Sequence, residues 1–293
     1  GVPHADGQLL SADPDLVFVE YSANDPLEPL YDETYESLCR KILNWRTKPA
    51  LMTVSMCWAD FQSTLPIHVK TNRYYDIPLI GYRDAVYMGV MSGKFPWSKQ
   101  SDDTVHPNRD GHWLAAQFII YRLREAQGMM DTADPPEETL PPARTANRFE
   151  DAAMLWSKTV GEAAAAVPDA QGDFAPAALT DFFDHQNGWV CAEPHGEPMT
   201  FTVTAGQIGI VFLQYKDGGA QDGARFTVTL DKGTAQEQTV ELSCTSGDEE
   251  PERTLNVVQL LDGEAGQTHT LEIAHNDDDG RVMIVGIMTA ARS

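Results

Sequence analysis

The apolar residues of this chain follow two different periods, and the change between them constrains the fold more than any other feature. In the first part, short unbroken apolar runs alternate with stretches in which apolar residues recur every three or four positions. From Met199 onward, apolar and polar residues alternate one by one, and Gly-rich or acidic turns separate the runs. The first pattern is typical of buried parallel strands joined by helices, and the second of an antiparallel sandwich. The sequence therefore predicts an α/β domain followed by a β-sandwich of jelly-roll type.

Three apolar runs in the first part are predicted to form one parallel sheet. In chain order they span residues 16–19, 51–56 and 77–82. The first run is expected to be buried on both faces, because its four residues are all apolar. Helices are predicted over residues 31–45, 65–75, 83–91 and after Pro107. In the last helix, Leu114, Phe118 and Tyr121 are expected to face the core, and His112 is given no catalytic role.

A Pro-rich acidic stretch separates the two parts and predicts an extended linker. The predicted domains are therefore an α/β domain (1–130), the linker (131–147) and a sandwich domain (148–293). Residues 148–166 fit either a strand or a helical turn. Trp189 is interpreted as a core residue, with sugar stacking as the alternative. The acidic turn at 276–280 is interpreted as a hairpin, with calcium binding as the alternative.

The net charge of −23 is concentrated in the second part of the chain. Residues 1–128 contain 12 Lys and Arg against 16 Asp and Glu, and the remainder contains 9 against 28. Such a surface repels phosphate backbones and anionic lipid, so neither nucleic acid nor a membrane is an expected partner. A neutral substrate, such as an acylated sugar, carries no such penalty. The composition predicts a soluble chain, and it leaves a cytoplasmic or a secreted location open.

The four cysteines are scattered along the chain and lack the spacing of a metal site. They are Cys39, Cys57, Cys191 and Cys244. We interpret them as buried thiols, with a disulfide between the last two as the alternative. Neither a metal nor a cofactor is predicted.

Two short stretches carry side chains suited to acyl-transfer chemistry. Asn24 follows the first predicted strand, where the carboxyl ends of parallel strands line the ligand crevice, and its amide can donate to an oxyanion. A simple turn is the alternative for this stretch. Asp103 lies three residues before His106, so its carboxylate can fold back onto Nδ1 and leave Nε2 free to act as a base. Trp58 follows the second strand and is either a pocket residue or buried.

The two stretches together resemble the SGNH (GDSL) hydrolase family. Ser22-Ala23-Asn24-Asp25 is similar to the family's Gly-x-Asn-Asp block, with Ser in place of Gly, and Asp103-Thr104-Val105-His106 is similar to its Asp-x-x-His block. The resemblance covers roughly residues 10–128, in which His68–Pro78 and Asp84 also resemble the approach to the last strand. It implies a flavodoxin-like, three-layer parallel sheet, in which the strands seen here match the third, fourth and fifth. The predicted sandwich resembles the one that accompanies some carbohydrate esterases of the family.

The resemblance also implies roles for named residues. His106 would accept a proton from a serine nucleophile, Asp103 would hold the imidazolium, and the Asn24 amide would bind the oxyanion. Ser22, Asp25 and Trp58 would contact a carbohydrate ester or another small ester. The Gly-Asp-Ser block that carries the family's nucleophile, and the later Gly that supplies a second oxyanion donor, do not occur in these residues.

Three hypotheses stay open. The chain is an ester hydrolase, with carbohydrate deacetylation preferred, or a non-catalytic glycan- or protein-binding module on a degenerate hydrolase scaffold, or an incomplete version of a longer active protein. Without the family's first two strands, the run at 16–19 would be a bare apolar sheet edge. A homodimer that covers this edge is therefore a further expectation.

Overall fold

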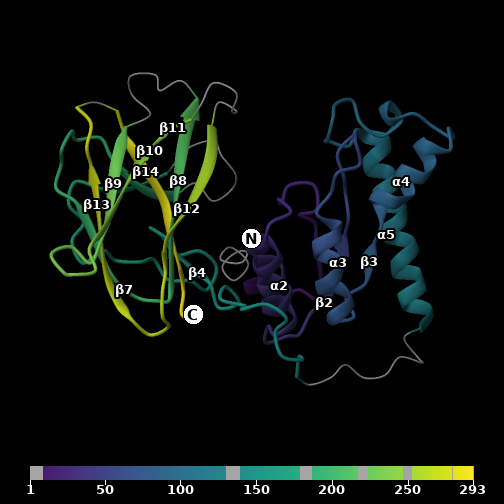
Figure 1. The fold of residues 1–293 in the computed structure, drawn as a ribbon, viewed down its shortest axis with the longest axis horizontal. Helices are drawn as coiled ribbons and strands as arrows, with labels where there is room; N and C mark the ends of the chain where they lie inside the picture. The colour runs from purple at the N-terminus through teal and green to yellow at the C-terminus, as the bar shows by residue number, and fades with distance from the viewer. Residues whose placement is uncertain are drawn as a thin grey trace. The chain divides into compact units, whose positions relative to one another are not determined.

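The computed structural model describes residues 9–129, 139–178, 187–216, 224–246, 253–278 and 280–292. The chain divides into two compact units, one of Asp13–Asn147 and the other of Arg148–Ser293 together with Gly1–Ala12. The first contains a parallel sheet with helices and the second contains antiparallel sheets (Figure 1). The predicted α/β domain followed by a β-sandwich is thus confirmed.

The α/β unit is built on a three-stranded parallel sheet of order β1-β2-β3. Its strands are β1 (Leu16–Val19), β2 (Ala50–Val54) and β3 (Leu79–Ile80). The helices are α2 (Pro29–Leu43), α3 (Leu65–Tyr74), α4 (Tyr82–Met91) and α5 (Arg109–Met129), and the short turns are η2 (Leu10–Ala12) and η3 (Trp97–Lys99). Because β1 and β2 are parallel neighbours, the loops that follow them leave the sheet at the same edge.

Two expectations about burial in this unit are wrong. Within β1, Val17 and Val19 are buried, but Phe18 is 40% exposed and Leu16 is only half-buried. Alternate side chains of a strand point to opposite faces, and the described residues cover only one face of β1. Tyr121 is exposed rather than part of the core. Tyr121 lies in the C-terminal half of α5, which has 21 residues. This helix packs against β3, a strand of only two residues, so the helix extends beyond the strand that covers it.

The described end of the predicted linker, residues 139–147, is fixed to α2 rather than extended in solvent. The buried Glu36 carboxylate accepts hydrogen bonds from the backbone N–H groups of Arg144 (2.6 Å) and Thr145 (2.7 Å). Although burial acts to raise the pKa of Glu36, hydrogen bonds from the Thr145 side chain, the Tyr75 hydroxyl and these two N–H groups hold the pKa below its usual value. Residues 139–147 are therefore part of the α/β unit, and residues 131–138 lie outside the described ranges.

The described residues of the sandwich unit form two sheets. One has the order β10-β9-β13-β7, and the other has the order β11-β8-β14-β6-β5, with β12 paired to β8 and β4 paired to β14. The strands are β4 (Ala153–Leu155), β5 (Ala175–Ala178), β6 (Asn187–Cys191), β7 (Met199–Thr204), β8 (Gln207–Lys216), β9 (Arg225–Leu230), β10 (Gln238–Ser243), β11 (Thr245–Ser246), β12 (Arg253–Asp262), β13 (Thr268–His275) and β14 (Val282–Ala290). In the ambiguous segment 148–166, β4 shows that the strand interpretation was correct for residues 153–155.

The core of the sandwich contains the aromatic residues whose role the sequence left open. Trp189 is buried and packs edge-on against Phe201, with ring centroids 5.5 Å apart, so the core interpretation is confirmed. All four cysteines are buried free thiols, as predicted. In the acidic turn, the Asp277 carboxylate pairs with Arg225 at 2.8 Å. Within the described ranges, no helix has the length and apolar character to cross a membrane.

Candidate active site

The Asp103 carboxylate organises the loop that carries His106. Its Oδ1 accepts the backbone N–H groups of Val105 and His106, both at 2.7 Å, and its Oδ2 lies 2.8 Å from His106 Nδ1. The bond from Val105, followed by the two from His106, holds the pKa of Asp103 well below its usual range. An ionised carboxylate only accepts, so Nδ1 carries the proton and Nε2 of the neutral ring is a free base. The His106 side chain is 82% exposed, so this base faces solvent.

Local packing fixes the ends of this His106 loop, which we define as residues 101–108. The indole Nε1 of Trp97 donates to the Asp103 carbonyl at 2.8 Å. On the other side, the Asn108 side chain accepts the N–H groups of Asp110 and Gly111, which caps the start of α5. A Cβ at Gly111 would lie 2.1 Å from the Gln100 carbonyl oxygen, so only glycine lets α5 begin this close to the loop.

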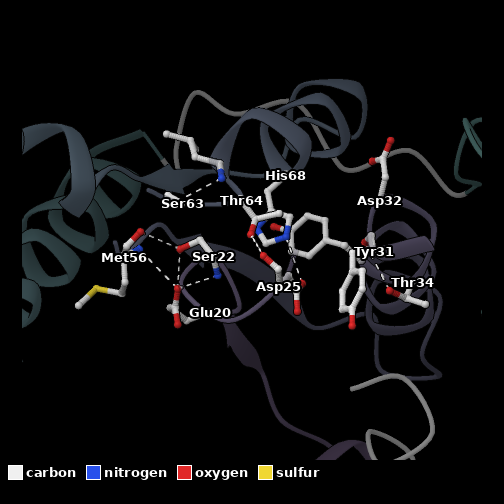
Figure 2. A network of polar contacts seen from close by, with 12 residues as sticks. Glu20, Ser22, Asp25, Tyr31, Asp32, Thr34, Met56, Ser63, Thr64 and His68 are labelled. Carbon is white, nitrogen blue, oxygen red and sulfur yellow. Dashed lines mark hydrogen bonds and ion pairs between the residues drawn. The ribbon is translucent and has the colours of Figure 1, made fainter. Parts of the chain in front are cut away.

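The Asn24 loop, residues 20–25, follows β1 and is held by a carboxylate of its own (Figure 2). Glu20 Oε1 accepts the Ser22 N–H at 2.9 Å, the Ser22 hydroxyl at 2.5 Å and the Met56 N–H at 3.4 Å. The N–H of Asn24 donates to the Tyr21 carbonyl at 3.1 Å, which closes a turn. The Asn24 side chain is exposed, so the turn leaves its amide available to a ligand.

Helix α3 holds the far end of the Asn24 loop. The N–H of Thr64 donates to the Ser22 carbonyl at 2.7 Å, and the Thr64 hydroxyl donates to the Asp25 carbonyl. The Asp25 carboxylate lies 3.3 Å from Nε2 of the buried His68 (Figure 2). The His68 ring in turn stacks on Tyr35, with ring centroids 3.6 Å apart. The position of Asn24 is therefore set by residues on both sides of it.

One further segment joins the two loops. This segment is the Trp58 loop, residues 57–62, which follows β2. The indole Nε1 of Trp58 donates to the Ala23 carbonyl at 2.6 Å. The next residue, Ala59, donates its N–H to the Thr104 carbonyl at 2.7 Å. Two consecutive residues thus hold the Asn24 loop and the His106 loop. This arrangement brings stretches that are far apart in the sequence to one edge of the sheet.

Two of the side chains that were predicted to bind substrate are directed toward other residues of the protein instead. Ser22 is only 1% exposed, and its hydroxyl points to Glu20, so it holds the loop and does not offer a surface to substrate. Its φ is not in the left-handed region, which is why Ser fits where the resembling block has Gly. Asp25 is turned toward His68. Trp58, by contrast, is 43% exposed.

Sequence reasoning did not identify Glu20 and Thr64 as supports of the site. A carboxylate directly after a buried strand and a Thr before the Leu-Pro start of α3 were the available signals. Across the described ranges, no group of three or more His, Cys, Asp or Glu side chains is arranged to hold a metal ion. The arrangement supplies an oriented base on the His106 loop and an exposed amide on the Asn24 loop, and the Trp58 loop bonds both loops.

Comparisons with known families and with curated proteins give no match. Among solved structures, the whole chain superposes on 77% of a two-domain esterase (CEX) active on acetylated mannans, with a TM-score of 0.81 and 22% identity. The same esterase co-crystallised with mannopentaose gives a TM-score of 0.81, 23% identity and coverage of 76% of that chain. This likeness confirms the predicted fold, an α/β domain followed by a β-sandwich.

Proposed function

We propose that this chain is a carbohydrate ester hydrolase of SGNH type that removes acyl groups from a neutral sugar. The observation that carries the proposal is the ionised Asp103 carboxylate on Nδ1 of His106, which leaves Nε2 as a solvent-facing base. The Trp58 loop, which bonds both the Asn24 loop and the His106 loop, supports a shared site. The esterase fold adds to this support.

The proposed roles follow from these groups. His106 Nε2 takes the proton of an attacking hydroxyl as that oxygen bonds to the ester carbonyl carbon, and returns it to the departing sugar oxygen. Asp103 keeps the proton on Nδ1 and stabilises the imidazolium. The Asn24 amide donates to the oxyanion of the tetrahedral intermediate. Water then repeats the cycle on the acyl intermediate and releases the acid.

The proposed mechanism also needs a serine hydroxyl as the nucleophile. The Gly-Asp-Ser block that carries it in the resembling family does not occur in residues 1–293. We expect in-frame codons for such a block in the DNA that precedes the codon for Gly1. Residues 1–293 alone are then expected to hydrolyse p-nitrophenyl acetate no faster than their His106→Ala variant, because losing a triad nucleophile leaves only slight catalysis.

The longer chain is expected to deacetylate an acetylated manno-oligosaccharide, and His106→Ala is expected to abolish this activity. Asp102→Asn is the matched control, because Asp102 accepts from Asn108 and does not contact the imidazole. Turnover that survives His106→Ala would overturn the proposed chemistry. The lack of a Gly-Asp-Ser block in these residues favours a second candidate, a non-catalytic glycan- or protein-binding module. Upstream DNA without the block, together with no ester hydrolysis, would overturn the hydrolase proposal and favour that candidate.

A further inference from the structure

We propose that the α/β unit carries its own polysaccharide-binding surface, an aromatic platform beside the His106 loop that stacks on pyranose rings of a neutral glycan. We define the platform by its four aromatic residues, Trp58, Phe61, Tyr87 and Trp97. The inference rests on the proposed function, because it names the polymer that the same site would take.

Three of the rings form a cluster around Phe61, and Trp58 is linked to this cluster through its backbone. The Phe61 ring packs edge-on against Tyr87, with centroids 5.0 Å apart, and edge-on against Trp97 at 6.1 Å. Its N–H donates to the Trp58 carbonyl at 2.8 Å, which closes the turn between these two aromatic residues. Arg83 Nε donates to the Phe61 carbonyl at 3.1 Å and fixes this turn, in which Phe61 has a φ of 65°.

The cluster borders the proposed catalytic residues. Trp97 donates to the carbonyl of Asp103 itself, and the Trp58 loop donates to Thr104. On the other side, the Trp58 indole is tied to Ala23, next to Asn24. A sugar ring stacked on the platform would therefore lie beside the groups that act on its ester.

Two rings of the platform are open to solvent and are held in place before any ligand binds. Trp58 is 43% exposed and Tyr87 is 38% exposed, although both rings are held by neighbours. Rigid aromatic side chains supply contact area at a low cost in conformational entropy. Their apolar faces match the C–H faces of a pyranose, and the exposed Asp60, Gln62 and Asp84 around them can bond sugar hydroxyls.

The sandwich unit offers no comparable surface in its described residues. Its exposed large apolar side chains there are Leu9, Val167 and Val257, and none of them is aromatic. Its two tryptophans, Trp156 and Trp189, are both buried. Residues 1–128 contain 16 Asp and Glu against 12 Lys and Arg, and this net negative charge also disfavours a polyanionic glycan. A neutral polysaccharide on the α/β unit is the occupant that fits both observations.

The test measures binding of mannopentaose and cellopentaose to the full chain by calorimetry. Tyr87→Ala and Trp58→Ala are each expected to weaken Kd about tenfold, because each removes one stacked ring. Tyr87→Phe and Trp58→Phe keep a ring and are expected to stay within about threefold of the wild type. Tyr121→Ala is the matched control, because this exposed tyrosine lies on α5 outside the platform.

The outcomes separate this inference from the proposed function. Weaker binding by the two alanine variants supports the platform, whether or not the protein hydrolyses esters. Unchanged Kd values in both variants would overturn it, and so would a lack of oligosaccharide binding at millimolar concentration, even if His106-dependent hydrolysis persists. A change in the light-scattering mass of Tyr87→Ala without a change in Kd would instead make the platform a protein contact.

Discussion

Replacing Ser22 by alanine tests whether the Asn24 loop is held from within. The Ser22 hydroxyl is buried and donates to the Glu20 carboxylate at 2.5 Å. In the variant, the Glu20 carboxylate still accepts hydrogen bonds from the N–H groups of residue 22 and Met56, so its charge keeps hydrogen-bond partners. The loss is then one hydrogen bond to a charged group, worth about 1.5–3 kcal/mol. We expect the free energy of unfolding of the α/β unit to fall by about 2 kcal/mol.

Ser22→Gly restores the residue of the resembling Gly-x-Asn-Asp block and sharpens the test. It removes the same hydroxyl and adds about 0.5–1 kcal/mol of backbone entropy to the cost of folding. The expected loss is therefore about 3 kcal/mol. Because the φ of Ser22 is not left-handed, glycine brings no compensating relief of strain.

Amide hydrogen exchange is the assay, because it reports opening residue by residue. The N–H of Thr64 bonds the Ser22 carbonyl and that of Met56 bonds Glu20. In Ser22→Ala these amides are expected to exchange about 30-fold faster, which corresponds to 2 kcal/mol. Ser92→Ala is the control, because this exposed hydroxyl bonds only the Gly89 carbonyl, and its effect is expected to stay within about 0.5 kcal/mol. Exchange within about threefold of the wild type in Ser22→Ala would refute the reasoning.

Four other predictions test separate parts of the structure. In Asp103→Asn, the two backbone donors keep the amide oxygen and turn the NH₂ group toward His106 Nδ1, so nitrogen NMR should show the proton on Nε2, and an unchanged tautomer would contradict this. In the longer chain that supplies the attacking hydroxyl, the same substitution should lower the rate of hydrolysis about 10⁴-fold. Trp189→Ala should lower the free energy of unfolding by about 3–5 kcal/mol in a urea titration. The control Val257→Ala, at an exposed position, should lower it by about 0.5 kcal/mol or less, and equal losses would contradict the core position of Trp189. Because the folded pKa of Glu36 is lowered, its stabilisation is present above the unfolded pKa and disappears as pH falls through the folded value. The stability gap to Glu36→Gln should therefore shrink as the pH falls below the usual pKa of 4.5, and a constant gap would contradict this. Light scattering at micromolar concentration should give the mass of a dimer that covers β1, whereas a monomer that binds no hydrophobic dye would exclude it.

Much of the site's local chemistry could be predicted from the sequence alone. The spacing of Asp103 and His106 places the two side chains within reach across three residues, and the structure contains this hydrogen bond at 2.8 Å. The change of apolar period from helical to alternating likewise predicted the two kinds of domain. Both inferences work because they depend on contacts between residues close in the chain, where the backbone leaves few arrangements.

The burial of individual side chains was decided only by the tertiary structure. The residues of β1 are all apolar, yet Phe18 is exposed, because burial depends on which elements cover each face of a strand. Ser22 is polar, yet it is buried, because its hydroxyl contacts Glu20 within the loop and the carbonyl of Met56, which comes from the segment after β2. The pairing of Trp58 with Ala23 follows from the parallel order of β1 and β2, which no local pattern specifies.

The link between the two candidate loops also depends on the fold. Asn24 and His106 lie on loops far apart in the sequence, and the Trp58 loop bonds both through neighbouring residues. A sequence records spacing along one chain, whereas these hydrogen bonds depend on the position of strand ends in space. The residue types of the candidate base and amide donor are thus a property of the sequence. Their shared edge of the sheet is a property of the packed structure.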